Sequence, residues 1–164
     1  MEYLIGSKKE FFDFINSIDK KDKIGILTHN DLDGIASAIF LEEILESKNL
    51  KIDFINFLDY KNGMFDKSIS NLKNKKITKL FLTDLNADAD LKSFEKLREK
   101  FDVFFIDHHP VNSELRNKNN VIKTKGSDCS AFTIYQLGDE IIDKKRWDWL
   151  VCATMFSEMS YKNL

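Results

Sequence analysis

Short runs of consecutive apolar residues alternate along the chain with longer segments whose apolar residues recur every three or four positions. Each run is bounded by polar residues, and few polar residues interrupt it, as is typical of strands that are buried on both faces. These runs predict five strands, at 23–28, 51–58, 77–84, 103–107 and 120–124.

The intervening segments have the spacing of helices that bury one face. Ser7 and Glu10 form a capping box before the first helix, which is expected to end near Asp19. Apolar positions from Ile35 to Leu45 predict the second helix, and a fainter period predicts a short helix within 60–76. Further helices are predicted at 88–101, 130–142 and 147–156.

Strands that alternate with helices predict an α/β fold, a parallel β-sheet of about five strands with helices on both faces. A length of 164 residues suits a single core, so we expect residues 1–164 to form one domain. Ligands of such sheets bind outside the carboxyl ends of the strands, which is where functional residues are expected.

Composition and charge exclude several classes of protein. The net charge of −2 gives no overall positive field, although it leaves room for a local basic groove. No apolar run approaches the roughly 20 residues that cross a bilayer, and the N-terminus lacks the order of a signal peptide. Cys129 and Cys152 have no metal-ligand spacing and indicate reduced thiols. We therefore expect a cytoplasmic protein without membrane contact.

All three histidines of the chain lie beside aspartates at the ends of predicted strands. A His-x-Asp-x-Asp-Gly segment follows the first strand, a single Asp ends the third, and an Asp-His-His triplet ends the fourth. Because the carboxyl ends of parallel strands meet at one edge, we expect these side chains to converge. The candidate residues are His29, Asp31, Asp33, Asp84, Asp107, His108 and His109.

A cluster of carboxylates repels itself unless cations lie in it. Mixed imidazole and carboxylate ligands with room for water suit Mn²⁺ or Mg²⁺. Two such ions roughly 3.5–4 Å apart would activate water and hold phosphoryl oxygens. Gly34 lets the backbone turn tightly into the next helix, whose free N-terminal amides would face a phosphate.

Each of the three strand-end segments can also be explained by an ordinary structural role. The Asp-rich turn at 29–34 can simply cap the following helix, and Asp84 can be an ordinary turn residue at a strand end. His108 and His109 can be buried core histidines. Three such coincidences at one sheet edge are far less expected than one shared site, so the functional interpretation is favoured.

The order and spacing of these motifs resemble the DHH phosphoesterase superfamily, and the His-x-Asp-x-Asp-Gly-Ile form is most similar to its RecJ-like branch. The resemblance covers nearly the whole chain and implies the DHH-type N-terminal, catalytic domain. It implies two ions, Mn²⁺ or Mg²⁺. His29 and Asp31 would bind one, Asp33 and His108 the other, and Asp84 would bridge both.

The resemblance also implies catalytic and substrate-binding residues. His109 would contact the scissile phosphate, and Asp107 would orient a neighbouring histidine. Gly126, Ser127 and Ser130 lie in a small-residue segment that opens the next helix, where hydroxyls and amides would take a phosphate oxygen.

The chain departs from the family pattern in two places. Ser157 and Glu158 stand where the family has an Asp after a later apolar helix, so one ligand of the second ion is replaced. Family members also carry a C-terminal substrate-binding domain of the DHHA1 type, with a glycine-rich segment. This chain ends before any such segment, so we expect the catalytic domain alone.

The activity implied is a phosphodiesterase, most similar to a RecJ-like exonuclease or an oligonuclease. It would hydrolyse single-stranded nucleic acid or short oligonucleotides with water activated by two metal ions. Two alternatives remain open: a small-molecule phosphatase, acting on phosphoadenosine phosphate or a cyclic dinucleotide, and a catalytically weakened binding or scaffold module.

Overall fold

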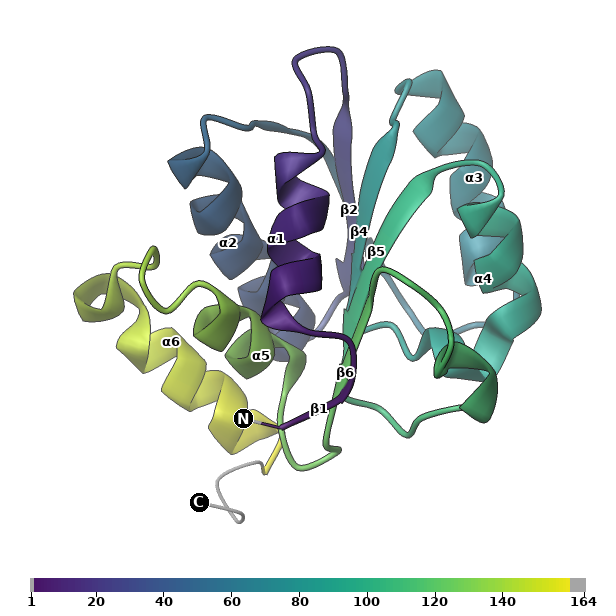
Figure 1. The fold of residues 1–164 in the computed structure, drawn as a ribbon. Coiled ribbons are helices and arrows are strands. Elements are labelled where there is room, and N and C mark those ends of the chain that lie inside the picture. The colour runs from purple at the N-terminus through teal and green to yellow at the C-terminus, as the bar shows by residue number, and fades with distance from the viewer. Residues whose placement is uncertain (1, 160–164) are drawn as a thin grey trace.

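The structure, a computed structural model, describes residues 2–159. Six strands form one sheet in the order β1-β6-β5-β4-β2-β3 (Figure 1). Five of them run parallel, and β1 pairs antiparallel with β6 at one edge. The strands are β1 (Tyr3–Ile5), β2 (Ile24–His29), β3 (Ile52–Leu58), β4 (Lys79–Thr83), β5 (Asp102–Asp107) and β6 (Val121–Thr124).

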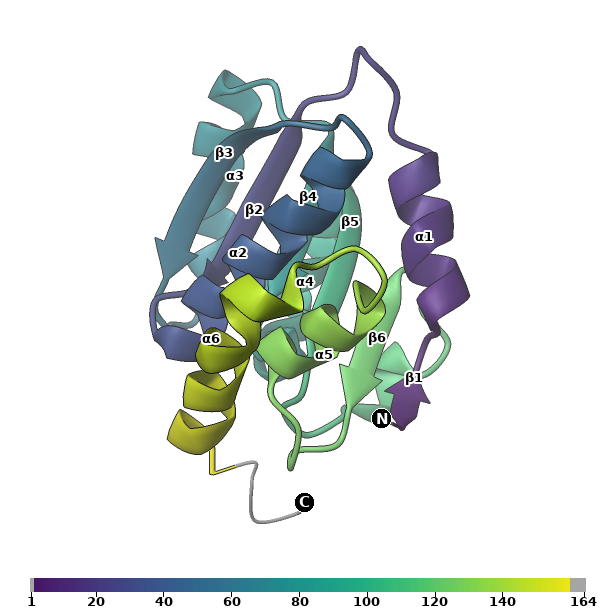
Figure 2. The same ribbon diagram turned by 90° about the vertical axis from the view of Figure 1, so that its left-hand side faces the viewer.

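Helices cover both faces of the sheet. Helices α1, α2, α5 and α6 lie on one face, and α3 and α4 lie on the other (Figures 1 and 2). Among the described residues, no helix is both long and apolar enough to cross a membrane. The helices are α1 (Lys8–Asn16), α2 (Leu32–Ser47), α3 (Met64–Asn74), α4 (Leu91–Arg98), α5 (Ser130–Leu137) and α6 (Lys144–Ser157), with short 3₁₀ turns η1 (Ala87–Asp90) and η2 (Ser113–Leu115).

The predicted fold class is confirmed, since the five predicted strands are the five parallel strands of this sheet. The antiparallel strand β1 was not predicted, because a three-residue run is too short to distinguish from a loop. The helix predicted at 88–101 divides into η1 and α4 at Asp90, whose carboxylate caps the second segment. The helix predicted at 130–142 ends at Leu137, and the first helix ends at Asn16.

Two apolar layers hold the helices against the sheet. On one face, the rings of Phe11 and Phe14 pack edge-on or tilted against Phe81 and Phe104 of the central strands, with centroids 5.2–6.5 Å apart. On the other face, α3 and α4 cover the opposite sides of the same strands. Successive residues of β4 and β5 therefore face different layers, which explains their uninterrupted apolar sequences.

The predicted capping box at the start of α1 forms only in part. The Ser7 hydroxyl accepts a hydrogen bond from the Glu10 amide at 3.2 Å. The Glu10 carboxylate instead accepts from the Asn120 amide at 2.7 Å, and so ties α1 to the loop before β6.

The turn from β2 into α2 requires a glycine. A Cβ on Gly34 would lie 2.6 Å from the carbonyl carbon of His29 and closer still to its oxygen. The Thr28 hydroxyl donates to the Gly34 carbonyl at 2.8 Å, which holds the helix against the end of the strand. This contact fixes the start of α2 relative to His29.

We expect Gly34→Ala to destabilise the protein by at least about 3 kcal/mol, because the clash is with backbone that cannot rotate away. Gly126→Ala is the matched control, since its Cβ would lie 3.7 Å from the nearest atom, the His108 carbonyl oxygen. Urea unfolding of both variants measures the difference. Equal stability of the two variants would contradict the close approach at Gly34.

Candidate metal centre

The predicted site residues come together at the carboxyl edge of the sheet. This edge is marked by the arrowheads of β3 and β6 in Figure 2. His29 ends β2, and Asp31 and Asp33 begin α2. Asp84 directly follows β4, and the triplet 107–109 lies at the end of β5.

Asp84 lies at the centre of the cluster. It is only 1% exposed, and its φ of 57° places it in the left-handed region, an uncommon conformation for a non-glycine residue. One carboxylate oxygen lies 3.4 Å from His108 Nε2 and accepts a hydrogen bond from the Ser130 hydroxyl at 3.2 Å. The other lies 3.9 Å from His29 Nδ1. The carboxylate therefore faces histidines on both sides.

Two groups of possible metal ligands share Asp84. One consists of His29, Asp31 and Asp84, and the other of Asp84, His108 and His109. Within each group the ligand atoms lie within 4.8 Å of one another. The second group contains His109, for which the sequence predicts a phosphate contact.

The first group has the features of a cation site. His29 Nδ1 is buried and makes no hydrogen bond, although Asp31 Oδ2 is only 2.7 Å away. A buried ring nitrogen that lies close to two carboxylates without a hydrogen bond to either fits a shared cation. The other oxygen of Asp31 accepts from the Gly34 amide at 3.0 Å. Asp31 therefore caps α2 with one oxygen while the other lies beside His29, so capping is compatible with the predicted metal-binding role.

Asp33 is placed differently from the other carboxylates. Its two oxygens accept hydrogen bonds from the amides of Ser130 and Ala131, at 2.8 and 2.7 Å, at the start of α5. Asp33 Oδ2 also lies 3.6 Å from His108 Nε2. Asp33 thus joins α2 to α5 beside the cluster. The α5 amides that were expected to bind a phosphate oxygen are occupied by this carboxylate.

A buried chain of charges orients His109. Its Nδ1 lies 2.9 Å from Asp107 Oδ1, and the other oxygen of Asp107 accepts from the Lys123 ammonium at 2.5 Å. Lys123 is fully buried and also donates to Asp88 at 2.7 Å. The prediction that Asp107 orients a neighbouring histidine remains to be tested by function, but its contact with His109 has the required geometry.

The carboxylates differ in their electrostatic surroundings. Burial and the nearby charges of Asp107 and Asp31 raise the pKa of Asp84 to about 9. Burial and the charge of Asp84 raise the pKa of Asp33 well above its usual value. Burial opposes ionisation of Asp107 too, but hydrogen bonding to His109 and the charge of Lys123 outweigh it and lower its pKa to about 2. Asp107 is therefore ionised at neutral pH, whereas Asp84 holds a proton unless a cation replaces it.

Tyr60 is part of the site, and sequence reasoning missed it. Its ring stacks on His29 with centroids 4.1 Å apart and planes 24° from parallel. Its hydroxyl lies 3.1 Å from both His109 Nε2 and the Asp84 carbonyl oxygen. Its place shortly after the end of β3 was the available indication, since the other site residues also follow strands. For Lys123, the indication was a lone charge within an apolar strand.

The remaining predicted residues lie around this centre. Ser130 contacts Asp84 and Asp33, Ser127 is half-buried in the preceding loop, and Gly126 is exposed near the His108 carbonyl. Ser157 stands where the resemblance implies an Asp after a later helix, and its hydroxyl donates back to the Thr154 carbonyl at 2.8 Å. Glu158, at the end of α6, is near enough for its charge to raise the pKa of Asp84.

Solved structures share this fold. An exopolyphosphatase-related protein from Bacteroides fragilis is 18% identical, with a TM-score of 0.58 over 86% of this chain and 46% of that one. Exonuclease RecJ bound to manganese is 13% identical, with a TM-score of 0.59 over 81% of this chain and 37% of that one. CDC45 from Entamoeba histolytica is 15% identical, with a TM-score of 0.63 over 94% of this chain and 36% of that one. The chain thus spans less than half the length of these proteins.

No curated protein sequence matches the chain. The model of the DHH family, N-terminal domain, matches residues 23–155. That range contains all seven residues predicted from the strand ends. Because the match takes in most of the sequence, the chain belongs to the DHH family.

Proposed function

We propose that this domain is a metal-dependent phosphodiesterase that cleaves single-stranded nucleic acid or short oligonucleotides. The observation that carries the proposal is the position of Asp84 between two groups of ligand atoms. A carboxylate shared in this way is what a pair of neighbouring divalent cations requires. We propose Mn²⁺ or Mg²⁺, because the ligands are imidazole and carboxylate and include no thiolate.

The proposed substrate class rests on likeness and on the surroundings of the centre. Among the proteins of similar fold, RecJ is described as an exonuclease and is bound to manganese. The exposed ring of Tyr60 lies directly beside the centre and offers a surface on which a base can stack. Single-stranded substrates expose the faces of their bases, which duplexes do not.

The ligand groups would hold the ions, and two bound ions would supply an activated water and hold the phosphoryl oxygens. Asp107 accepts from His109 Nδ1 and thereby leaves Nε2 as the ring nitrogen that faces the Tyr60 hydroxyl. Lys123 keeps Asp107 ionised and fixed. We propose that His109 Nε2, which faces the Tyr60 hydroxyl, contacts the scissile phosphate when substrate binds.

A small-molecule phosphatase is the second candidate. The observation that favours it is the similar fold of a protein described as exopolyphosphatase-related. A binding or scaffold module is the third. It is favoured by Ser157, which stands where the family has an Asp and whose hydroxyl bonds within its own helix.

The deciding experiment is hydrolysis of a labelled single-stranded oligonucleotide by the purified chain with Mn²⁺, compared with polyphosphate and phosphoadenosine phosphate. Asp84→Asn should reduce the rate at least about 100-fold, because changes even beside metal ligands cost 10–100-fold. The control is Asp102→Asn, the same change at the opposite end of β5 in an exposed ion pair.

Cleavage of the oligonucleotide that needs Mn²⁺ and Asp84 supports the proposal. Cleavage of the small phosphates alone would select the second candidate. Inactivity on all substrates, with Mn²⁺ bound, would select the binding module. Full activity of Asp84→Asn would show that Asp84 does not bridge two ions.

A second prediction concerns stability without metal. Because the folded-state pKa of Asp84 is raised, its contribution to stability is complete below its ordinary pKa of 3.8 and is lost as the pH rises toward about 9. We therefore expect the metal-free melting temperature to fall by several degrees from pH 5.5 to 9, since 1 kcal/mol corresponds to about 2–4 °C at this size.

Mn²⁺ should reduce this fall, because the cation takes the place of the proton. Asp84→Asn without metal should also reduce it, whereas Asp102→Asn should leave it unchanged. Differential scanning calorimetry at each pH provides the measurement. A melting temperature that falls equally in Asp84→Asn and in the unmodified chain would rule out Asp84 as the source.

A further inference from the structure

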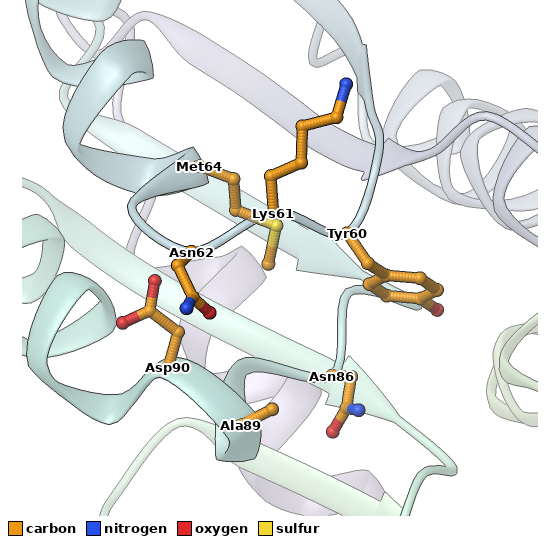
Figure 3. A pocket seen from close by; sticks show the side chains of 7 residues that line it. All are labelled: Tyr60, Lys61, Asn62, Met64, Asn86, Ala89 and Asp90. Atoms are coloured by element: carbon orange, nitrogen blue, oxygen red, sulfur yellow. The ribbon is translucent and has the colours of Figure 1, made fainter.

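A hollow of about 140 Å³ opens beside the metal centre, between the loop that follows β3 and the connection from β4 to α4 (Figure 3). We infer that this hollow binds the nucleobase of the nucleotide whose phosphate lies at the metal centre, an inference that rests on the proposed function. The residues that line it include Tyr60, Asn62, Met64, Asn86 and Asp90.

The position of the hollow relates it to the site of cleavage. Tyr60 belongs to both, because its ring lines the hollow and its hydroxyl lies 3.1 Å from His109 Nε2. The two sites are therefore separated by one side chain. This shared side chain is why we place the base of the bound nucleotide in the hollow and its phosphate at His109.

The walls of the hollow are fixed before any ligand binds. Gly63 has a φ of 72°, and its amide donates to the Asp90 carboxylate at 2.7 Å, which links the two loops. Asn86 is held in the left-handed region with a φ of 41°, and its carbonyl accepts from the Ala89 amide at 2.9 Å. Such conformations cost energy in a non-glycine residue and are concentrated at ligand sites.

The side chains suit a planar ring with a polar edge. The side-chain amides of Asn62 and Asn86 make no hydrogen bond with other described residues. Each side-chain amide offers both a donor and an acceptor. Met64 and the Tyr60 ring provide apolar surface. Asn pairs well with the edges of bases, and bases stack on aromatic rings. The volume of about 140 Å³ leaves room for a ring system.

A second phosphate does not suit this hollow. The Lys61 ammonium lies 3.1 Å from Asp59, and Figure 3 shows it directed away from Asn86 and Ala89. The Asp90 carboxylate stands in the wall and would repel an anion. An uncharged base fits this electrostatic setting better than a phosphate does.

Calorimetry with the Mn²⁺-loaded chain tests the inference through binding. The probes are adenosine 5′-monophosphate, uridine 5′-monophosphate and ribose 5-phosphate, which share the sugar and phosphate. The tighter-binding nucleotide should bind about tenfold more strongly than ribose 5-phosphate, given the usual effect of stacking one base. Asn86→Ala should reduce this preference, because it removes the side-chain amide that meets the edge of the base while the Tyr60 ring stays in place. Asn74→Ala, at the opposite end of α3, should retain the preference.

Equal affinity for the nucleotides and ribose 5-phosphate would overturn the base subsite while leaving the proposed function in place. Failure of all three probes to bind would overturn both, because no phosphate would be held at the metal centre. If Asn86→Ala does not fold, NMR of the unmodified chain decides: the side-chain amide signals of Asn62 and Asn86 should shift with a nucleotide and not with ribose 5-phosphate. Unshifted signals would contradict the assignment.

Discussion

The electrostatic problem that shapes this protein is the burial of several carboxylates at one edge of a sheet. Isolated buried charges are costly, so each must be paired, hydrogen-bonded or neutralised. Asp107 is paired with the fully buried Lys123, and Asp33 accepts two amides at the start of α5. Asp84 has no lysine or arginine partner among the described residues. It must keep a proton or take a cation.

The backbone around Asp84 supports this arrangement. The residue itself is left-handed, which turns the chain sharply after β4. The close contact of Gly34 with His29 sets the start of α2, so that Asp31 can cap the helix and still face the cluster. Asp33 then binds α5 to the same edge. The carboxylates therefore serve both to join the elements and to build the site.

Much of the fold and of the site could be predicted from the sequence, because periodicity and strand-end position are local properties. The apolar runs at β4 and β5 identify strands. Because the strands are parallel, Asp84, which follows β4, is predicted to lie at the same sheet edge as the residues that follow β5. Sequence reasoning did not predict that Asp33, 97 residues away in sequence, accepts from the amides of Ser130 and Ala131 at the start of α5. Substrate binding by Gly126, Ser127 and Ser130 stays a prediction.

Tyr60 and Lys123 were missed for the same reason. Their roles depend on partners that the fold brings close: Tyr60 lies against His29 and His109, and Lys123 lies between Asp88 and Asp107. Sequence reasoning identified residues whose type suggests chemistry, such as histidines beside aspartates. It could not identify residues that matter through distant contacts, nor the half-formed capping box in which Glu10 binds Asn120.

The most direct test of the shared position of Asp84 is a crystal structure grown with Mn²⁺, with diffraction recorded on both sides of the manganese absorption edge. We expect two anomalous peaks roughly 3.5–4 Å apart, one on each side of the Asp84 carboxylate, with His29 and Asp31 at the first and His108 at the second. A single peak away from Asp84, or no peak with Mn²⁺ in excess, would contradict the account.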